Sequence, residues 1–293
     1  MTILITGANG QVGSELRERN PAGLIALGRR ELDVTDPDAV MRALRQYRPR
    51  VVINAAAYTA VDRAELEKEL AQKINAEGAE FLAKACRQVG AALLHLSTDY
   101  VFDGRKSSAY LESDDPSPQG AYARSKASGE QNIRAVLEEH IILRVSWVFG
   151  AHGSNFVKTI LRLAAEKPEL RVIADQRGCP TYAGAIAETL LLLAGRIDRG
   201  EPITWGTYHY TGMPETTWHA FAVEIVERAR QLGLLSVSPV VRPITTAEYP
   251  LPAPRPQNSL LDGTRAHQQL GLIRQDWRDG LQQMLMTLKA NQP

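Results

Sequence analysis

The chain has 293 residues, a net charge of +1 at pH 7 and an ordinary globular composition, with 44% hydrophobic and 23% charged residues. A chain of this length can form one large domain or two. The charge balance argues against bulk electrostatic attraction to nucleic acid or a membrane surface, and no segment reaches the ~18 apolar residues of a membrane span. We therefore expect a cytoplasmic protein that binds neither nucleic acid nor a membrane.

The N-terminal residues predict a nucleotide-binding turn. Residues 2–6 are typical of a β-strand, and Gly7, Gly10 and Gly13 follow at intervals of three before a helix over residues 14–19. Glycines let the backbone turn sharply and let a pyrophosphate approach the helix N-terminus, where free N–H groups favour anions. Because both the strand and the helix are expected, we predict that this turn binds a dinucleotide. The remaining residues that we assign to it are Gln11 and Val12.

The end of the second predicted strand, residues 24–27, bears on the choice of dinucleotide. An acidic residue usually binds the ribose hydroxyls of NAD at this place, but here Gly28 follows the strand. The adjacent Arg29 and Arg30 can bind a 2′-phosphate through charge-assisted hydrogen bonds, although arginines in a surface loop are often simply solvated. The pair favours NADPH and leaves NADH possible, and we expect Asp33 to lie near the adenine.

A third predicted strand, residues 51–53, is short and apolar, as expected for a parallel strand that is buried on both faces. The small residues after it leave room for the backbone of a ligand. We assign to the cofactor site Asn54, Ala55, Ala56 and Ala57. A charged segment with Glu65 and Glu67 then predicts a solvated helix face, and a helix over residues 75–88 is expected before the next strand.

Tyr122 and Lys126 lie four residues apart in a segment, residues 120–130, whose composition favours a helix. The spacing places both side chains on one helix face. An ammonium group nearby lowers the pKa of a phenol from its ordinary value near ~10 and makes tyrosine a usable proton donor. The same spacing also occurs by chance on solvated helices, so the pair needs further support.

Thr98 is the expected third member of this site. Residues 91–96 form an apolar run of strand length, after which Ser97, Thr98, Asp99 and Tyr100 follow. A hydroxyl just past the carboxyl end of a buried strand points into the crevice where open α/β sheets bind ligands. The alternative is that these residues only form a turn and cap a short helix. The tyrosine and lysine downstream favour the catalytic interpretation.

Strands and helices alternate up to residue 150, which predicts a doubly wound parallel sheet of the Rossmann type over residues 1–150. The regular alternation of strands and helices ends beyond this point. There we predict a smaller mixed α/β substrate domain over residues 151–293, with some segments docking on the first domain. The elements expected there include helices over residues 156–165, 183–194 and 218–231, a strand over residues 170–173 and two short C-terminal helices. A Pro-rich segment, residues 242–258, is either a linker or a rigid loop over a ligand.

Together these motifs resemble the extended short-chain dehydrogenase/reductase superfamily and, within it, the dTDP-4-dehydrorhamnose reductase family. The likeness covers most of the chain, because further segments resemble the same family: residues 144–147, 155–156, 175–181, 217–218 and 254–260. The resemblance implies reduction of the 4-keto group of dTDP-4-dehydro-L-rhamnose (dTDP-6-deoxy-L-lyxo-4-hexulose) to dTDP-L-rhamnose, a step towards cell-wall polysaccharide. The hydride would come from a nicotinamide cofactor.

The resemblance also implies roles for individual residues. Tyr122 would protonate the new alkoxide, Lys126 would bind the nicotinamide ribose and lower the Tyr122 pKa, and Thr98 would hydrogen-bond the keto oxygen. The residues assigned to the dTDP-sugar are Thr59, Thr98, Asp99, Tyr100, Trp147, Asn155 and Arg255. For Trp147, packing in the core is an equally good interpretation.

Other functions remain open at this point. One is a different nucleotide-sugar reductase, epimerase or 4,6-dehydratase of the same superfamily, although dehydratases resemble one another in having a glutamate where Tyr100 follows Asp99. Another is a non-catalytic, NADP-binding regulatory subunit of the methionine adenosyltransferase type. We expect a monomer or a homodimer. With two cysteines, Cys86 and Cys179, the chain has neither a disulfide framework nor a cysteine metal site.

Some members of the resembled family use a magnesium ion at a dimer contact. Glu15 and Glu188 are the candidates here, but Gly184 and Ala185 leave the expected acidic pair incomplete. We therefore predict no metal, and a role for magnesium stays uncertain.

Overall fold

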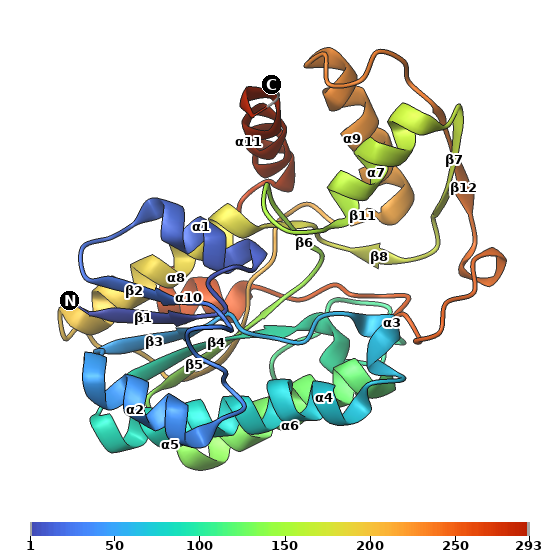
Figure 1. Cartoon of the computed structure of the whole chain (residues 1–293). Coiled ribbons are helices and arrows are strands. Elements are labelled where there is room, and N and C mark those ends of the chain that lie inside the picture. Colours follow the sequence, from blue (N-terminus) through green and yellow to red (C-terminus); the bar gives the residue numbers. More distant parts are fainter. Residues whose placement is uncertain (1, 292–293) are drawn as a thin grey trace.

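A six-stranded sheet forms the centre of the larger part of the molecule (Figure 1). In this computed structural model, which describes residues 2–291, the strand order is β10-β5-β4-β3-β1-β2 and all neighbouring strands are parallel. The strands are β1 (Ile3–Thr6), β2 (Leu24–Leu27), β3 (Val51–Asn54), β4 (Ala92–Thr98), β5 (His140–Val145) and β10 (Gly206–His209). The predicted doubly wound α/β class is confirmed.

Helices cover both faces of this sheet because successive strand residues point to opposite faces. Ile3 and Ile5 pack in one core with helices α1, α8 and α10, whereas Leu4 packs in a second core with α2, α5 and α6. The bounds of these helices are α1 (Gln11–Arg19), α2 (Pro37–Tyr47), α5 (Gly78–Val89), α6 (Gly120–Val136), α8 (Ala183–Asp198) and α10 (Thr264–Leu270). Burial on both faces explains the continuous apolar runs of β3 and β4.

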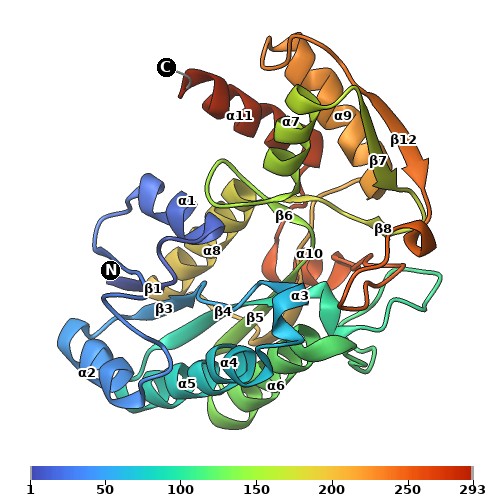
Figure 2. The ribbon, with the colours of Figure 1, turned by 45° about the vertical axis from the view of Figure 1, so that its right-hand side comes forward.

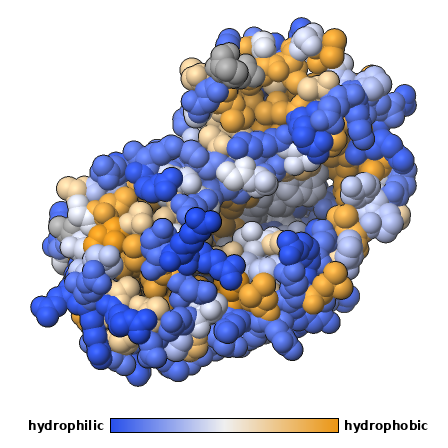
Figure 3. All heavy atoms as spheres, in the orientation of Figure 1, coloured by the Kyte–Doolittle hydropathy of each residue, from blue (hydrophilic) through white to orange (hydrophobic). Residues whose placement is uncertain are grey.

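The smaller part of the molecule combines three helices with a two-stranded parallel sheet (Figure 2). Its main elements are α7 (Phe156–Glu166), α9 (Trp218–Gln231), α11 (Trp277–Ala290), β7 (Glu169–Ile173) and β12 (Val240–Ile244). Aromatic contacts of Phe221 with Phe149, Phe156 and Trp277 join these helices to the segment after β5. On the face shown in Figure 3, the surface is hollowed between the two parts.

Three elements from beyond residue 150 lie on the larger part. Strand β10 extends the central sheet beside β5, helix α8 packs against α1, and α10 packs against β10. The chain therefore passes between the two parts more than once. The remaining short elements are α3 (Val61–Ala64), α4 (Lys68–Gln72), β6 (Val148–Phe149), β8 (Arg177–Gly178), β9 (Thr181–Tyr182) and β11 (Thr216–Thr217).

The helix predicted over residues 75–88 differs from the observed one. Helix α4 leads into a π-helical turn, Lys73–Glu77, which continues into α5. The Asn75 side chain in this turn bonds the N–H and the carbonyl of Tyr58 and the Ser125 hydroxyl. These contacts come from segments distant in the chain, so helix periodicity alone does not reveal the widened turn.

The composition of the charged segment before α4 predicts a solvated helix face. In the structure, two of its glutamates instead make hydrogen bonds to other segments. Glu65 accepts a hydrogen bond of 2.6 Å from the backbone N–H of Ala121, at the start of α6, and Glu67 accepts one from the Tyr58 hydroxyl. Helix α6 has no side-chain cap at its own N-cap residue, Gln119. Glu65 therefore supplies the missing acceptor from another segment, which corrects the prediction.

Within residues 2–291, none of the helices is both long enough and apolar enough to span a membrane.

Candidate functional site

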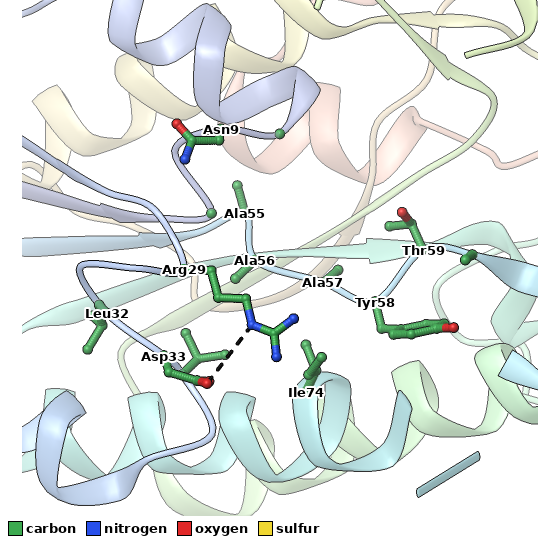
Figure 4. Close-up of a pocket in the computed structure, with 14 residues that line it drawn as sticks. Asn9, Arg29, Leu32, Asp33, Ala55, Ala56, Ala57, Tyr58, Thr59 and Ile74 are labelled. Atoms are coloured by element: carbon green, nitrogen blue, oxygen red, sulfur yellow. Dashed lines mark ion pairs between the residues drawn. The ribbon is translucent and has the colours of Figure 1, made fainter. Parts of the chain in front are cut away.

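A cavity of about 370 Å³ opens between the carboxyl ends of β1 and β3 (Figure 4). The strand order reverses at this place, and open α/β sheets bind ligands at such switch points. The cavity is lined by the glycine turn, the loop after β2 and the segment after β3. Its lining residues are Gly7, Asn9, Gly10, Arg29, Leu32, Asp33, Val34, Ala55, Ala56, Ala57, Tyr58, Thr59, Ala60 and Ile74.

The glycine turn has the shape that a pyrophosphate requires. Gly7 has a φ of +71°, and a Cβ there would lie 2.5 Å from the backbone nitrogen of Ala56. A Cβ on Gly13 would lie 2.2 Å from the Gly7 carbonyl oxygen. Helix α1 starts at this turn without a side-chain cap, so its first N–H groups and its dipole favour an anion. These residues fit a dinucleotide cofactor.

The structure separates the two arginines after β2. Arg29 lines the cavity with its Nε atom 4.0 Å from the Asp33 carboxylate, whereas Arg30 is not among the lining residues (Figure 4). Hydrogen bonds from Thr35 hold the pKa of Asp33 below its ordinary value. Because the Arg29 side chain is 74% exposed, its guanidinium is free to bind a phosphate at the cavity rim.

Asn54 lies directly behind the cavity. Its Oδ1 atom accepts hydrogen bonds from the Thr6 hydroxyl and from the N–H of Ala56, at 2.7 and 3.1 Å. These bonds join the ends of β1 and β3 and set the path of the alanine segment. Of the other residues assigned to the turn, Val12 is buried in the core.

Tyr122 lies next to the cavity wall on α6. It packs in a small cluster with Tyr58, which lines the cavity, and its ring meets that of Tyr100 edge-on at 5.6 Å between centroids. Burial raises the pKa of Tyr122 to about 12, and a hydrogen bond with Thr98 acts in the opposite direction. The phenol therefore carries its proton at neutral pH. The structure thus brings Thr98 and Tyr122 together, as their places in the sequence led us to expect.

Lys126 lies one helical turn away from Tyr122 and is 2% exposed. Its Nζ atom donates to the Leu96 carbonyl oxygen at 2.6 Å and lies 3.2 Å from His95 Nε2. Burial lowers the pKa of Lys126 to about 8, against the opposing effect of Glu130. The expected lowering of the Tyr122 pKa by Lys126 is not found, because this amine is held at β4 and burial dominates at the phenol.

Asp99 and Tyr100 complete the edge of the site at the end of β4. The Thr98 hydroxyl donates to the Asp99 carboxylate at 3.0 Å, and burial raises the pKa of Asp99 to about 6. Burial also raises the pKa of Tyr100. Asp99 therefore holds the Thr98 hydroxyl through this bond, and its contact with the sugar stays a prediction.

Arg255 ties the Pro-rich segment to helix α3. Its guanidinium donates to the Asp62 carboxylate at 2.7 Å, and the other Asp62 oxygen accepts from the N–H of Ala253. Pro254 of the same segment lies close to Gly120, the first residue of α6: a Cβ added to Gly120 would lie 3.4 Å from the Pro254 side chain. Residues 253–255 are therefore packed on α3 and the start of α6, which favours the loop interpretation of this part of the segment over a linker.

Trp147 and Asn155 lie between the two parts of the molecule. The Trp147 ring stacks on that of Trp218, with centroids 3.6 Å apart, and its backbone has a φ of 48°. Asn155 caps α7 and donates to Gln11 Oε1 and to the Gly150 carbonyl oxygen. Both polar atoms of the Asn155 side chain are thus used within the protein.

The two glutamates considered for magnesium are bridged by an arginine. Arg19 lies 2.7 Å from Glu15 and 3.0 Å from Glu188. In the part of the chain that the structure describes, no group of three or more His, Cys, Asp or Glu residues has a metal-binding arrangement.

Several residues of the site were missed by the sequence analysis. These are Asp62, Asn75, His95 and Glu130. Glu130 lies four residues after Lys126 and His95 two before Ser97, so helix and strand periodicity could have placed both on the site's inner face. No comparable local signal marks Asp62 or Asn75, whose partners are remote in the chain.

Comparisons with known proteins agree with this geometry. The family described as RmlD substrate binding domain matches residues 1–290. The chain is similar to dTDP-4-dehydrorhamnose reductase of Aggregatibacter actinomycetemcomitans, with 46% identity over 95% of this chain and 96% of that protein.

Two solved structures have the same fold over their whole length. The reductase structure from Clostridium acetobutylicum has a TM-score of 0.91 and 38% identity, covering 99% of this chain and 100% of that chain. The Bacillus anthracis reductase, solved in complex with NADP, has a TM-score of 0.90 and 35% identity, covering 98% and 100%. The chain belongs to the dTDP-4-dehydrorhamnose reductase family.

Proposed function

We propose that this protein is an NADPH-dependent oxidoreductase that reduces the 4-keto group of dTDP-4-dehydro-L-rhamnose to give dTDP-L-rhamnose. The observation that carries this proposal is the place of the Tyr122 side chain, which packs against Tyr58 in the wall of the dinucleotide cavity. The relatives and the NADP-bound neighbour support the same reaction. NADH remains a possible second cofactor.

We assign cofactor binding to the residues that line the cavity and to Lys126 beside it. The turn formed by Gly7, Gly10 and Gly13 would hold the pyrophosphate at the start of α1, and Arg29 would hold the 2′-phosphate. Lys126 would bind the nicotinamide ribose. When bound, the reduced nicotinamide supplies the hydride for the reaction.

Tyr122 and Thr98 act on the carbonyl oxygen of the sugar: Tyr122 protonates it and Thr98 hydrogen-bonds it. As the carbonyl carbon gains a hydride, negative charge develops on its oxygen, and Tyr122 donates the phenolic proton to that oxygen. The Thr98 hydroxyl, whose proton is directed to the Asp99 carboxylate in the structure, would stabilise the same oxygen by turning that proton towards it. A phenol whose pKa is raised to about 12 holds this proton at neutral pH until it is needed.

The dTDP-sugar would lie between the two parts, which we propose as a cofactor domain over residues 1–150 and a mainly substrate-binding domain over residues 151–293. Trp147 and Tyr100 offer aromatic surface, and the Arg255–Asp62 pair holds a loop over this side. We assign Thr59 to the same side, because it lies at the Tyr58 end of the cavity. Asn155 acts indirectly, by joining α7 to Gln11.

Two further assignments belong to this proposal. The free, buried Cys86 and Cys179 fit a reducing compartment, so we place the enzyme in the cytoplasm. We expect a monomer or a homodimer, which sedimentation of the purified protein distinguishes.

The reaction is tested by following NADPH oxidation with purified protein and dTDP-4-dehydro-L-rhamnose made by a 3,5-epimerase. We expect turnover with formation of dTDP-L-rhamnose. Tight NADPH binding without turnover on this sugar would overturn the substrate assignment, and absence of turnover on any 4-keto nucleotide sugar would favour a regulatory NADP-binding protein.

A further inference from the structure

A chain of buried polar side chains connects the glycine turn to Lys126. The Thr6 hydroxyl donates to Asn54 Oδ1 at 2.7 Å, Asn54 Nδ2 lies 2.9 Å from His95 Nδ1, and His95 Nε2 lies 3.2 Å from Lys126 Nζ. None of these four residues is more than 2% exposed. They come from β1, β3, β4 and α6, so the chain crosses the sheet beneath the cavity. His95 has no role in the mechanism given above.

The backbone determines the direction of these hydrogen bonds. The N–H of Ala56 can only donate, and it points at Asn54 at 3.1 Å, so the Asn54 atom that faces it is the oxygen. The Asn54 amide nitrogen therefore faces His95 and donates to Nδ1. Burial, with Lys126 and His140 nearby, holds the pKa of His95 well below its ordinary value, so the imidazole is neutral. Its single proton is then on Nε2.

The Nε2–H group of His95 faces the Lys126 amine. An ammonium has three donors and no lone pair, so it would meet this group donor to donor. An uncharged amine has two donors and one lone pair. It can donate to the Leu96 carbonyl oxygen, as observed at 2.6 Å, and accept from His95 at the same time. The surrounding geometry thus matches the uncharged amine.

We propose that His95 is a positioning residue for Lys126: held by Asn54 as the Nε2–H tautomer, it donates to the lysine and favours the uncharged amine in the free enzyme. The tautomer thereby links the state of Lys126 to the glycine turn through Asn54 and Thr6. For its kinetic test, this inference rests on the proposed reductase function.

Other groups around Lys126 act on the same equilibrium. Glu130, on α6, favours the charged amine, but its carboxylate is paired with Arg144 at 2.6 Å and with Arg134 at 3.1 Å. His140, on β5, acts electrostatically on His95, and burial lowers the pKa of His140 so that it adds no charge at neutral pH. The Leu96 carbonyl accepts from either form of the amine. Of the two groups within hydrogen-bond distance of the Lys126 amine, His95 is thus the one that distinguishes its two forms.

The kinetic test compares His95→Gln with the wild type. A glutamine at this place can turn its amide oxygen towards Lys126 and accept from the ammonium, so the charged amine is stabilised. In the kinetic test, the charged Lys126 amine is taken as the form that binds the nicotinamide ribose, so NADPH-dependent activity falls as pH rises through the Lys126 pKa. The pH profile of kcat/KM for NADPH reports this pKa in the free enzyme. We expect this falling limb to move upward by about one pH unit in His95→Gln. The matched control is His140→Gln, which also removes a buried histidine, one that bonds the Leu137 carbonyl. In this variant the falling limb of the pH profile should lie at the same pH as in the wild type.

A second measurement does not require turnover. Nitrogen-15 NMR of histidine-labelled wild-type protein distinguishes the two neutral tautomers, and we expect His95, identified by its loss in His95→Gln, as Nε2–H at neutral pH. A proton on Nδ1, or an unmoved kinetic limb in folded His95→Gln, would overturn the proposal. If the wild type failed to reduce the sugar, the NMR result would still decide this inference separately from the proposed function.

Discussion

At the scale of single residues, the site depends on how burial treats two ionisable groups in opposite ways. Burial disfavours charge, so it raises the pKa of the Tyr122 phenol and lowers that of the Lys126 amine. Both groups are therefore pushed towards their uncharged forms. For Tyr122 this form is the proton donor that we propose for the reaction.

The substitution Tyr122→Phe removes this proton donor and leaves the ring in its cluster with Tyr58 and Tyr100. We expect kcat to fall by about 10²-fold or more, with little change in NADPH affinity. The check combines steady-state kinetics with NADPH binding followed by fluorescence. Turnover close to that of the wild type would contradict the role assigned to Tyr122.

Arg29 and Arg30 provide a matched pair for cofactor preference. Because only Arg29 of the two lines the cavity, Arg29→Ala should raise KM for NADPH by about 10-fold through loss of a charge-assisted contact, and leave KM for NADH nearly unchanged. Arg30→Ala is the control and should leave both KM values unchanged. Equal effects of the two substitutions would show that the 2′-phosphate is not bound by Arg29 alone.

At the scale of elements, a buried ion pair fastens α6 to the sheet beneath Lys126. Glu130 is fully buried and accepts from Arg144 Nε and Nη2, at 2.8 and 2.6 Å, and from the Ser97 hydroxyl at 2.6 Å. The pair joins α6, which carries Tyr122, to β5, and the Ser97 bond joins it to the end of β4, which carries Thr98. Removal of one partner would leave an uncompensated buried charge.

Glu130→Ala should therefore lower the free energy of unfolding by about 3–5 kcal/mol, measured by urea denaturation. The control Glu166→Ala removes a glutamate from an exposed pair with Arg162, and it should change that free energy by less than about 1 kcal/mol. A similar loss in both variants would show that the buried pair has no special importance.

The same pair gives a pH dependence of stability. Despite burial, Arg144 and Ser97 hold the pKa of Glu130 below its ordinary value. The stabilisation is therefore present above the ordinary glutamate pKa and is lost as pH falls through the lower folded-state value. Wild-type protein should lose more stability than Glu130→Ala over that acidic range.

At the scale of the whole molecule, the cofactor cavity lies where β1, α1 and β3 meet; β1 and β3 contribute residues to both cores, and α1 to the first. A ligand that binds there and not to the unfolded chain stabilises the whole fold by mass action. The α8, β10 and α10 elements, which come from the second half of the chain, share this sheet and its core.

NADP⁺ at roughly 100 times its Kd should therefore stabilise the protein by about 2.7 kcal/mol, seen as a rise in Tm by calorimetry. Gly13→Val should abolish the rise, because a side chain there meets the Gly7 carbonyl oxygen. Gly195→Ala, on α8 and beside only the flexible end of Arg199, should keep it. A rise retained in Gly13→Val would place NADP⁺ outside this turn.

The sequence by itself determined the fold class, the glycine turn and the places of Thr98, Tyr122 and Lys126 relative to strand and helix. These features follow from local patterns, namely strand hydrophobicity, glycine spacing and the four-residue helical repeat. Helix α9 and strand β2 have the predicted bounds for the same reason.

Only the tertiary structure decided which groups meet. It places Arg29, but not Arg30, in the cavity wall, and it places Glu65 at a backbone N–H group at the start of α6. It also pairs Arg255 with Asp62 and holds Lys126 beside His95. These contacts join segments far apart in the chain, and burial, which sets the pKa values of the site, depends on all elements packed around it. Local sequence patterns carry no record of such distances, so the chemistry of the site became visible only in the folded chain.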